Sequence, residues 1–427
     1  MKFFKSALSL LVVVALFCLA MFGLNFYTGP LVEANQAGDA LAPLLAVMPE
    51  GSGFDGDALI YDGADAASST LTDVSAQVLK IYKEANGNGF AVQCQTEGNY
   101  SGDPMSLTFG VDAEGKITGV QIDNYTDSID VRTKDEAFLP SFAGQDSTLA
   151  DVNLVAGCTF SSSSIRNAVQ AGMEALISNN LISAGVKTPA QILTELIPVV
   201  APGMAQDGIL KATEMEASGS AVAAYQADNG TGFAYIMQEG DGSYLAVVNA
   251  MGACAVFDVD GNNVTADHDA LTQEAKAAAA AGQEDFSAAL EKKLNKLYEG
   301  ASDITFLSPD TFGTVVSAAS FQYEGAAYTM YYCRPVGFDQ MDLYVVLDET
   351  GAIVKLDAKQ LFFETDYFPV DDNVDQPAYK ASFEGMTADG FPADAGVITG
   401  ATMTSGAVRQ AVADSFAAYS QIQNGGE

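Results

Sequence analysis

Tyr82-Lys83-Glu84-Ala85-Asn86-Gly87-Asn88-Gly89-Phe90 returns further along the chain as Tyr225-Gln226-Ala227-Asp228-Asn229-Gly230-Thr231-Gly232-Phe233. The flanking segments repeat as well. The matching segments are Leu44–Pro49 with Leu196–Pro198, and Val111–Thr118 with Val256–Val264 and Leu347–Ile353. Each of the last three joins two apolar stretches through an acidic turn that contains glycine, which is typical of a β-hairpin. The sequence therefore predicts one supersecondary unit that occurs three times.

The first and third repeats also end alike. After the hairpin comes a Thr-Asp pair (Thr126-Asp127 and Thr365-Asp366), then an aromatic-rich stretch, a turn with glycine and a final helix. The middle repeat continues instead into residues 270–299, which are rich in Ala, Glu and Lys and broken near Gly282, as expected for a helix or helical hairpin. We expect a transmembrane anchor over residues 1–30, a first unit over 31–188, a truncated, partly helical middle unit over 189–308 and a third unit over 309–427. All three units are predicted to be α+β, with antiparallel hairpins and helices.

The N-terminal segment indicates the compartment. Lys2 and Lys5 precede an apolar run over residues 7–26, close to the length of about 20 residues that a membrane-spanning helix needs. Positive charge before this run, and acidic residues from Glu33 onward, favour a cytoplasmic N-terminus and an extracytoplasmic bulk. A cleaved signal peptide is the alternative. We expect a retained anchor and a single-pass protein of the cell membrane.

Composition excludes several classes of function. The chain has 427 residues and a net charge of −36, which repels nucleic acid and free phosphate-containing ligands alike. A single histidine, His268, leaves little scope for histidine-based catalysis or metal binding. The five cysteines show no paired spacing, so zinc sites and iron–sulfur clusters are not expected. Whether a disulfide forms is left open by the sequence.

Two hydroxyl-rich segments open the final helices of the first and third repeats. They are Ala156-Gly157-Cys158-Thr159-Phe160-Ser161-Ser162 and Thr399-Gly400-Ala401-Thr402-Met403-Thr404-Ser405. Glycine and small residues leave room for a bulky group, and the start of a helix favours a phosphate. Ser and Thr also cap helices everywhere, so one such cluster would be read as a cap. Two copies, each closing the same kind of unit, indicate a shared phosphate-containing ligand.

With these residues the chain resembles the FMN-binding domain family, which includes the G subunit of Rnf-type electron-transport complexes and the C subunit of the sodium-pumping NADH:quinone reductase. The family motif is Asp-x-x-Ser/Thr-Gly-Ala-Thr-x-Thr-Ser, and a flavin transferase esterifies FMN to the Thr after Gly-Ala. Thr402 occupies that position, and Thr159 is the second candidate. The anchor followed by residues 25–33 is similar to the Rnf subunit. The resemblance implies covalent FMN as the cofactor.

The match is incomplete in places. The motif's Asp is Gly396 in the third repeat and Asn153 in the first. The family's Glu-Thr-Pro-Gly loop near the flavin survives as Glu364-Thr365 in the third repeat and only as Tyr125-Thr126 in the first. The predicted cofactor-binding residues are Glu364, Thr365, Thr399, Gly400, Ala401, Thr402, Thr404, Ser405 and Arg409, and in the first repeat Thr126, Gly157, Cys158, Thr159, Ser161, Ser162 and Arg166. No catalytic residue or metal ligand is predicted.

Arg166 and Arg409 each lie seven residues after their Thr, two helical turns along the same face. Side chains lean toward the helix N-terminus, which favours charge compensation of a phosphodiester. An ion pair with a neighbouring carboxylate is the alternative.

The resemblance implies an electron carrier working with a membrane redox complex, loaded by an FMN transferase, rather than a stand-alone enzyme. A flavin-dependent extracellular reductase and a binding or scaffold protein with a vestigial motif remain alternatives. The middle unit, which has no Gly-Ala-Thr ending, is expected to bind no flavin.

Overall fold

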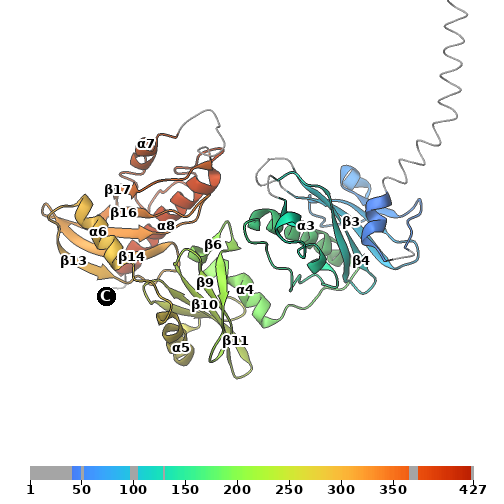
Figure 1. Cartoon of the computed structure of the whole chain (residues 1–427), viewed down its shortest axis with the longest axis horizontal. Helices are drawn as coiled ribbons and strands as arrows, with labels where there is room; N and C mark the ends of the chain where they lie inside the picture. Colours follow the sequence, from blue (N-terminus) through green and yellow to red (C-terminus); the bar gives the residue numbers. More distant parts are fainter. Residues whose placement is uncertain (1–40, 50–51, 97–103, 128–129, 365–373, 425–427) are drawn as a thin grey trace, which may run out of the picture. The chain divides into compact units, whose positions relative to one another are not determined.

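The structure is a computed structural model that describes residues 41–49, 52–96, 104–127, 130–364 and 374–424. It contains two compact units, residues 1–187 and 188–427, which are described separately (Figure 1). The apolar run over residues 7–26 lies outside the described residues, so the anchor stays a prediction. Within the described ranges, no helix is both long and apolar enough to cross a membrane.

The N-terminal unit is built on one five-stranded antiparallel sheet in the order β1-β2-β3-β4-β5. Its strands are β1 (Leu59–Asp62), β2 (Val78–Lys83), β3 (Gly89–Gln95), β4 (Ser106–Asp112) and β5 (Ile117–Asn124), followed by α2 (Val131–Lys134), a 3-10 turn η2 (Pro140–Phe142) and α3 (Thr159–Ser178). Ile165, Val169 and Met173 of α3 are buried against one face of the sheet. Leu44 and Val47, from a helix over residues 41–47, pack with Ala91 in a separate cluster.

The C-terminal unit contains two more five-stranded antiparallel sheets. The middle sheet has the order β12-β11-β10-β9-β8, and the third has the order β13-β14-β15-β16-β17. The middle elements are α4 (Pro189–Val200), β6 (Ala205–Gln206), β7 (Ile209–Leu210), β8 (Ala212–Met215), β9 (Ala221–Ala227), β10 (Gly232–Glu239), β11 (Gly242–Asn249), β12 (Cys254–Phe257) and α5 (Asp269–Ala280). The third set is α6 (Ser287–Leu297), β13 (Ser302–Leu307), β14 (Val315–Tyr323), β15 (Ala326–Cys333), β16 (Leu343–Asp348), β17 (Ile353–Ala358), α7 (Gln376–Ala381) and α8 (Thr402–Asn424).

Each sheet of the C-terminal unit has a helix on both faces. Alternate residues of a strand point to opposite faces, so one strand supplies two cores. In β10, Ile236 packs in a cluster with Leu193 of α4, whereas Tyr235 packs in another with Leu271 of α5. In the third sheet α6 and α8 take the two faces in the same way. The common plan is helix, five strands, helix, which confirms the predicted α+β class.

The middle repeat is more complete than the sequence indicates. It keeps the whole sheet and its closing helix α5, and lacks only the long insert that separates the last strand from the last helix in the other repeats. The second half of the predicted helical hairpin, α6, contacts β14 and β15 and belongs to the core of the third sheet. The sequence of an amphipathic helix does not indicate which sheet the helix packs on. This is why the sequence grouped α5 and α6 into one helical hairpin of the middle repeat.

The sequence match of Val111–Thr118 with Val256–Val264 is wrong, because the second segment lies one hairpin too late in the chain. In the first and third sheets, Asp112 and Asp348 close the turn between the last two strands, with Oδ1 accepting from the backbone two and four residues on. The equivalent turn of the middle sheet begins at Asn249, whose Oδ1 accepts from Met251 N and Ala253 N at 2.9 Å each. The similar turn at Asp258 follows β12 and lies one hairpin later.

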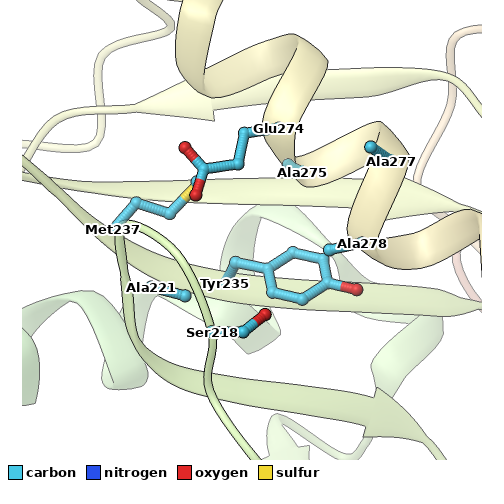
Figure 2. Close-up of a pocket in the computed structure, with 8 residues that line it drawn as sticks. All are labelled: Ser218, Ala221, Tyr235, Met237, Glu274, Ala275, Ala277 and Ala278. Carbon is cyan, nitrogen blue, oxygen red and sulfur yellow. The ribbon is translucent and has the colours of Figure 1, made fainter.

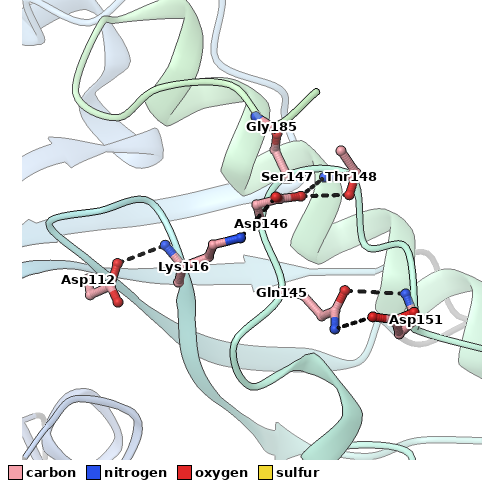
Figure 3. A network of polar contacts seen from close by, with 8 residues as sticks. All are labelled: Asp112, Lys116, Gln145, Asp146, Ser147, Thr148, Asp151 and Gly185. Carbon is pink, nitrogen blue, oxygen red and sulfur yellow. Dashed lines mark hydrogen bonds and ion pairs between the residues drawn. The ribbon is translucent and has the colours of Figure 1, made fainter. Parts of the chain in front are cut away.

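The insert of the first repeat is fixed to the sheet by a polar network (Figure 3). Asp146 Oδ2 pairs with Lys116 Nζ at 3.0 Å, and its Oδ1 accepts from the Thr148 hydroxyl at 2.6 Å. Ser147 Oγ accepts from Gly185 N at 2.8 Å. These bonds connect the segment before α3 to the sheet and to the chain that follows α3.

Candidate functional site at two helix starts

The start of α8 is shaped by Gly400 and Ala401. Gly400 has φ +83°, a conformation that other residues adopt at a cost, and no atom lies within 4 Å of where a Cβ would stand. Ala401 is fully buried and fixes the turn in the core, while Thr402, the first residue of the helix, is exposed. The turn therefore presents Thr402 beside open space.

A carboxylate occupies the amide groups of the first helical turn. Glu364 Oε1 accepts from Met403 N at 2.5 Å and from Thr404 N at 3.2 Å. The unpaired N–H groups of a helix start are the groups that would bind a phosphate, and Glu364 already uses two of them. The sequence argument for free amides at this position is therefore incomplete, because the protein supplies its own anion.

The hydroxyls of the cluster are not equivalent. Thr404 Oγ1 donates to the carbonyl of Phe362, and Ser405 Oγ donates to Ala401 O at 2.7 Å while accepting from Ile398 N at 3.0 Å. Both residues are fully buried. Among the described residues, the Thr402 hydroxyl has no hydrogen-bond partner. The structure thus commits two hydroxyls to the fold and leaves the one predicted to carry FMN on the surface.

The first repeat builds the same turn. Gly157 has φ +75° and open space at its Cβ position, and Cys158 is buried in the place of Ala401. Ser162 Oγ donates to Cys158 O at 2.9 Å and accepts from Val155 N at 3.0 Å, the same offsets as around Ser405. Thr159 opens α3, partly exposed, and within the described chain its hydroxyl likewise forms no hydrogen bond.

An acidic residue also stands at the first-repeat site. Asp127 is buried and accepts from the Ser161 hydroxyl at 2.5 Å, and Ser161 is the counterpart of Thr404. Thr126, beside it, is partly exposed. In the third repeat, Thr365 lies outside the described residues, and Thr399 is exposed in the turn before α8.

The arginine of the third repeat packs on the insert. Arg409 Nε donates to Pro392 O at 3.4 Å, and its guanidinium lies 5.5 Å from the centre of the Phe391 ring. Among the residues described, Arg409 forms no ion pair with a carboxylate. Charge compensation of a phosphodiester stays a prediction for Arg409 and for the partly exposed Arg166.

A contact that the local motif does not reveal lies beside Thr404. A Cβ on Gly337 would stand 2.7 Å from Thr404 Cα, and Phe338 N donates to Thr404 Oγ1 at 3.4 Å. The loop after β15 thus packs directly on the first turn of α8. Its residues are distant in sequence and have no repeat counterpart in the motif, so only the fold brings them together.

Other candidates from the sequence are structural. His268 Nδ1 lies 2.7 Å from Glu239 Oε2 and stacks near Tyr244 before α5. Within the described part of the chain, no cluster of three or more His, Cys, Asp or Glu residues could hold a metal ion. The described cysteines, Cys94, Cys158, Cys254 and Cys333, are not in disulfide bonds. Burial raises the pKa of Cys254 to about 11, so this thiol is unreactive at neutral pH.

A pocket of about 300 Å³ lies in the middle repeat, between α5 and the sheet (Figure 2). Its lining residues are Ser218, Ala221, Tyr235, Met237, Glu274, Ala275, Ala277 and Ala278. Glu274 is held by Ser220, through N at 2.6 Å and Oγ at 2.9 Å. None of the predicted cofactor-binding residues lines this pocket.

Comparison with known protein families matches one part of the chain. Residues 100–174 match the family model described as the FMN-binding domain, a stretch that runs through β4, β5 and most of α3 and includes Thr159. The chain therefore contains a domain of the FMN-binding family, which its motifs resemble, and this supports FMN as its cofactor. No curated protein matches the chain.

Proposed function

We propose that this protein is a membrane-anchored, extracytoplasmic flavoprotein that carries FMN through phosphoester bonds to Thr402 and Thr159 and transfers electrons. The observation that carries the proposal is the division of labour among the hydroxyls. At both helix starts the two later hydroxyls are bonded within the protein. The first hydroxyl is exposed at Thr402 and partly exposed at Thr159, and each Thr follows by two residues a glycine with open space.

The residues at each start fit a phosphate ester. The Thr hydroxyl supplies the attachment atom, the glycine leaves room for the phosphate, and the helix start favours negative charge. Covalent attachment also overcomes the repulsion between FMN and a chain of net charge −36. When bound, FMN supplies one- and two-electron chemistry, while the protein sets its orientation and potential.

The partner that loads the flavin would be an FMN transferase, as the resemblance to covalent FMN-binding proteins implies. The apolar run over residues 7–26 would anchor the protein next to membrane electron-transport subunits. The proposed role is an electron-transfer subunit. Protease added to intact cells tests this topology. We expect the chain to be digested, and full protection of the chain would contradict the proposed orientation.

The direct test is co-expression with an FMN transferase, followed by denaturing electrophoresis and flavin fluorescence. Thr402→Val keeps the side-chain shape and removes the hydroxyl, so we expect it to reduce the fluorescent band by about half if both sites load. Thr387→Val, in the same insert but bonded to Asp389 O, is the matched control. A double variant Thr402→Val/Thr159→Val that keeps full fluorescence would overturn the attachment sites, and a wild-type chain without fluorescence would favour the scaffold alternative.

A further inference from the structure

The middle repeat reaches the Thr402 site through the β6–β7 hairpin. Gln206, which is buried at the end of β6, donates from Nε2 to the carbonyl of Gly337. Gly337 packs on Thr404 so closely that a side chain would not fit between them. Only the backbone at Gly337 thus lies between Gln206 of the middle repeat and the first turn of α8.

The hairpin is held from its base. Gly203, just before β6, accepts from Asn229 Nδ2 at 3.0 Å and from the Thr231 hydroxyl at 2.8 Å. Gly203 N donates to Phe312 O at 3.1 Å. The Asn-Gly turn that precedes β10 therefore connects the base of the hairpin to the middle sheet.

The tip of the hairpin follows Gln206 directly in the chain. Asp207 and Gly208 form its turn, with φ +49° and +75°. Partial burial raises the pKa of Asp207, nearby Lys211 opposes the rise, and the carboxylate of Glu364 adds to it. Asp207 follows Gln206 directly in the chain, so the bond from Gln206 to Gly337 keeps Asp207 next to the loop that packs on the helix start capped by Glu364.

We propose that the β6–β7 hairpin of the middle repeat forms a wall of the Thr402 flavin site, with Asp207 next to the cofactor and Gln206 as a positioning residue. The inference rests on the proposed function and extends it. The middle repeat binds no flavin of its own but completes the site of the third repeat. A carboxylate beside a flavin disfavours the reduced, more negative form, so Asp207 lowers the reduction potential.

The test uses full-length protein loaded by the transferase in a Thr159→Val background, so that the only FMN is on Thr402. Asp207→Asn keeps a residue that tolerates positive φ and removes the charge. We expect it to raise the midpoint potential of the flavin. Gln206→Ala is expected to shift the flavin absorption and fluorescence, because the loop under Thr404 loses its support.

Gln283→Ala is the matched control, since Gln283 Nε2 makes a comparable amide-to-carbonyl bond to Ala250 O at 2.5 Å elsewhere in the C-terminal unit. The inference is overturned if Asp207→Asn and Gln206→Ala both leave the midpoint potential, the flavin spectra and the melting temperature unchanged. The proposed function would then remain intact. An equal change in Gln283→Ala also overturns the inference, since the effect is then one of general stability. A wild-type chain without FMN on Thr402 overturns both.

Discussion

The carboxylate of Glu364 accepts a hydrogen bond from the backbone N–H of Met403 at 2.5 Å, across the insert that separates the third sheet from α8. The same oxygen accepts from Thr404 N at 3.2 Å. The site predicted to receive a phosphate is thus capped by a side chain of like charge. Any phosphoester on Thr402 either displaces this carboxylate or lies beside it.

Replacing Glu364 distinguishes these two arrangements. In protein without flavin, Glu364→Ala should lower the free energy of unfolding of the C-terminal unit by about 1 kcal/mol, since it removes a helix cap. If the phosphate takes over the two amides after loading, the same substitution should cost less in the flavinylated protein. Urea unfolding of both forms measures the difference, and an equal loss in each shows that the phosphate does not use these amides.

For folding without flavin, the glycine two residues before each Thr should be needed for its backbone angle. At Gly400, φ +83° makes Gly400→Ala destabilising by about 1 kcal/mol, although no atom crowds the new methyl group. Gly406→Ala, within α8 and equally uncrowded, should have the opposite sign and stabilise by roughly 0.5–1 kcal/mol. Denaturant midpoints of the two variants provide the comparison. A stabilising Gly400→Ala would mean that the turn is not constrained as described.

Acid should weaken the N-terminal unit through Asp146. Its hydrogen bond from Thr148, together with Lys116, lowers the pKa of this carboxyl to about 2. A lowered pKa contributes stability above the unfolded value of 3.8, and the contribution is lost as the pH falls toward 2. Asp146→Asn should therefore cost about 1 kcal/mol at pH 7, allowing for solvent screening, and almost nothing near pH 2. A loss that does not change with pH would assign the effect to shape alone.

Much of the architecture follows from local pattern. The repeated Asn-Gly-x-Gly-Phe segment lies at the second hairpin of both the first and the middle sheet, so the repeat correctly indicates equivalent positions. Turn chemistry was also the source of the error. Asn249 and Asp258 both close Asx-type turns followed by glycine, and the acidic one looks more like its counterparts although the amide one is equivalent.

The candidate site also has a part that the sequence predicts and a part that it does not. The hydroxyl clusters could be located from sequence because their residues are contiguous. Neither Gln206 nor Gly337 could be linked to Thr404, since that relationship depends on how the middle and third sheets pack in one unit. Sequence spacing within one helix carries no information on such contacts.

The turn of the middle sheet has Asn249 where the other two sheets have Asp, and the hydrogen bonds of Asn249 explain this difference. Its Oδ1 closes the turn as Asp would, and its Nδ2 also donates to Pro309 O at 3.0 Å and Thr311 O at 2.9 Å. Asn249→Asp keeps the turn and turns two donors into an acceptor facing carbonyls, so it should destabilise the C-terminal unit by about 2–3 kcal/mol. Asp112→Asn, the reciprocal change in the exposed turn of the first sheet, should stay within about 0.5 kcal/mol. Equal effects would show that the cross-repeat bonds contribute nothing.

The number of flavins per chain is the most discriminating prediction. Ser162 and Ser405 lock their turns with the same pair of bonds, which supports two sites of one design. The family match lies within the first repeat, over residues 100–174, whereas the closer motif is in the third. Both observations favour two FMN groups per chain, which would allow electrons to enter through one flavin and leave through the other.

Two features oppose loading at Thr159. Cys158 stands in the place of Ala401, and Asn153 in the place of the motif's Asp, so the transferase has fewer of its expected residues. Because Cys158 is buried and its backbone accepts the same bond from Ser162 that Ala401 accepts from Ser405, we expect recognition to survive. Intact mass of the co-expressed chain should therefore show two FMN phosphoester additions, with one lost in Thr402→Val and the other in Thr159→Val. A single addition that disappears with Thr402→Val and persists with Thr159→Val would make the first repeat a structural copy and remove the basis for electron transfer between two flavins on one chain.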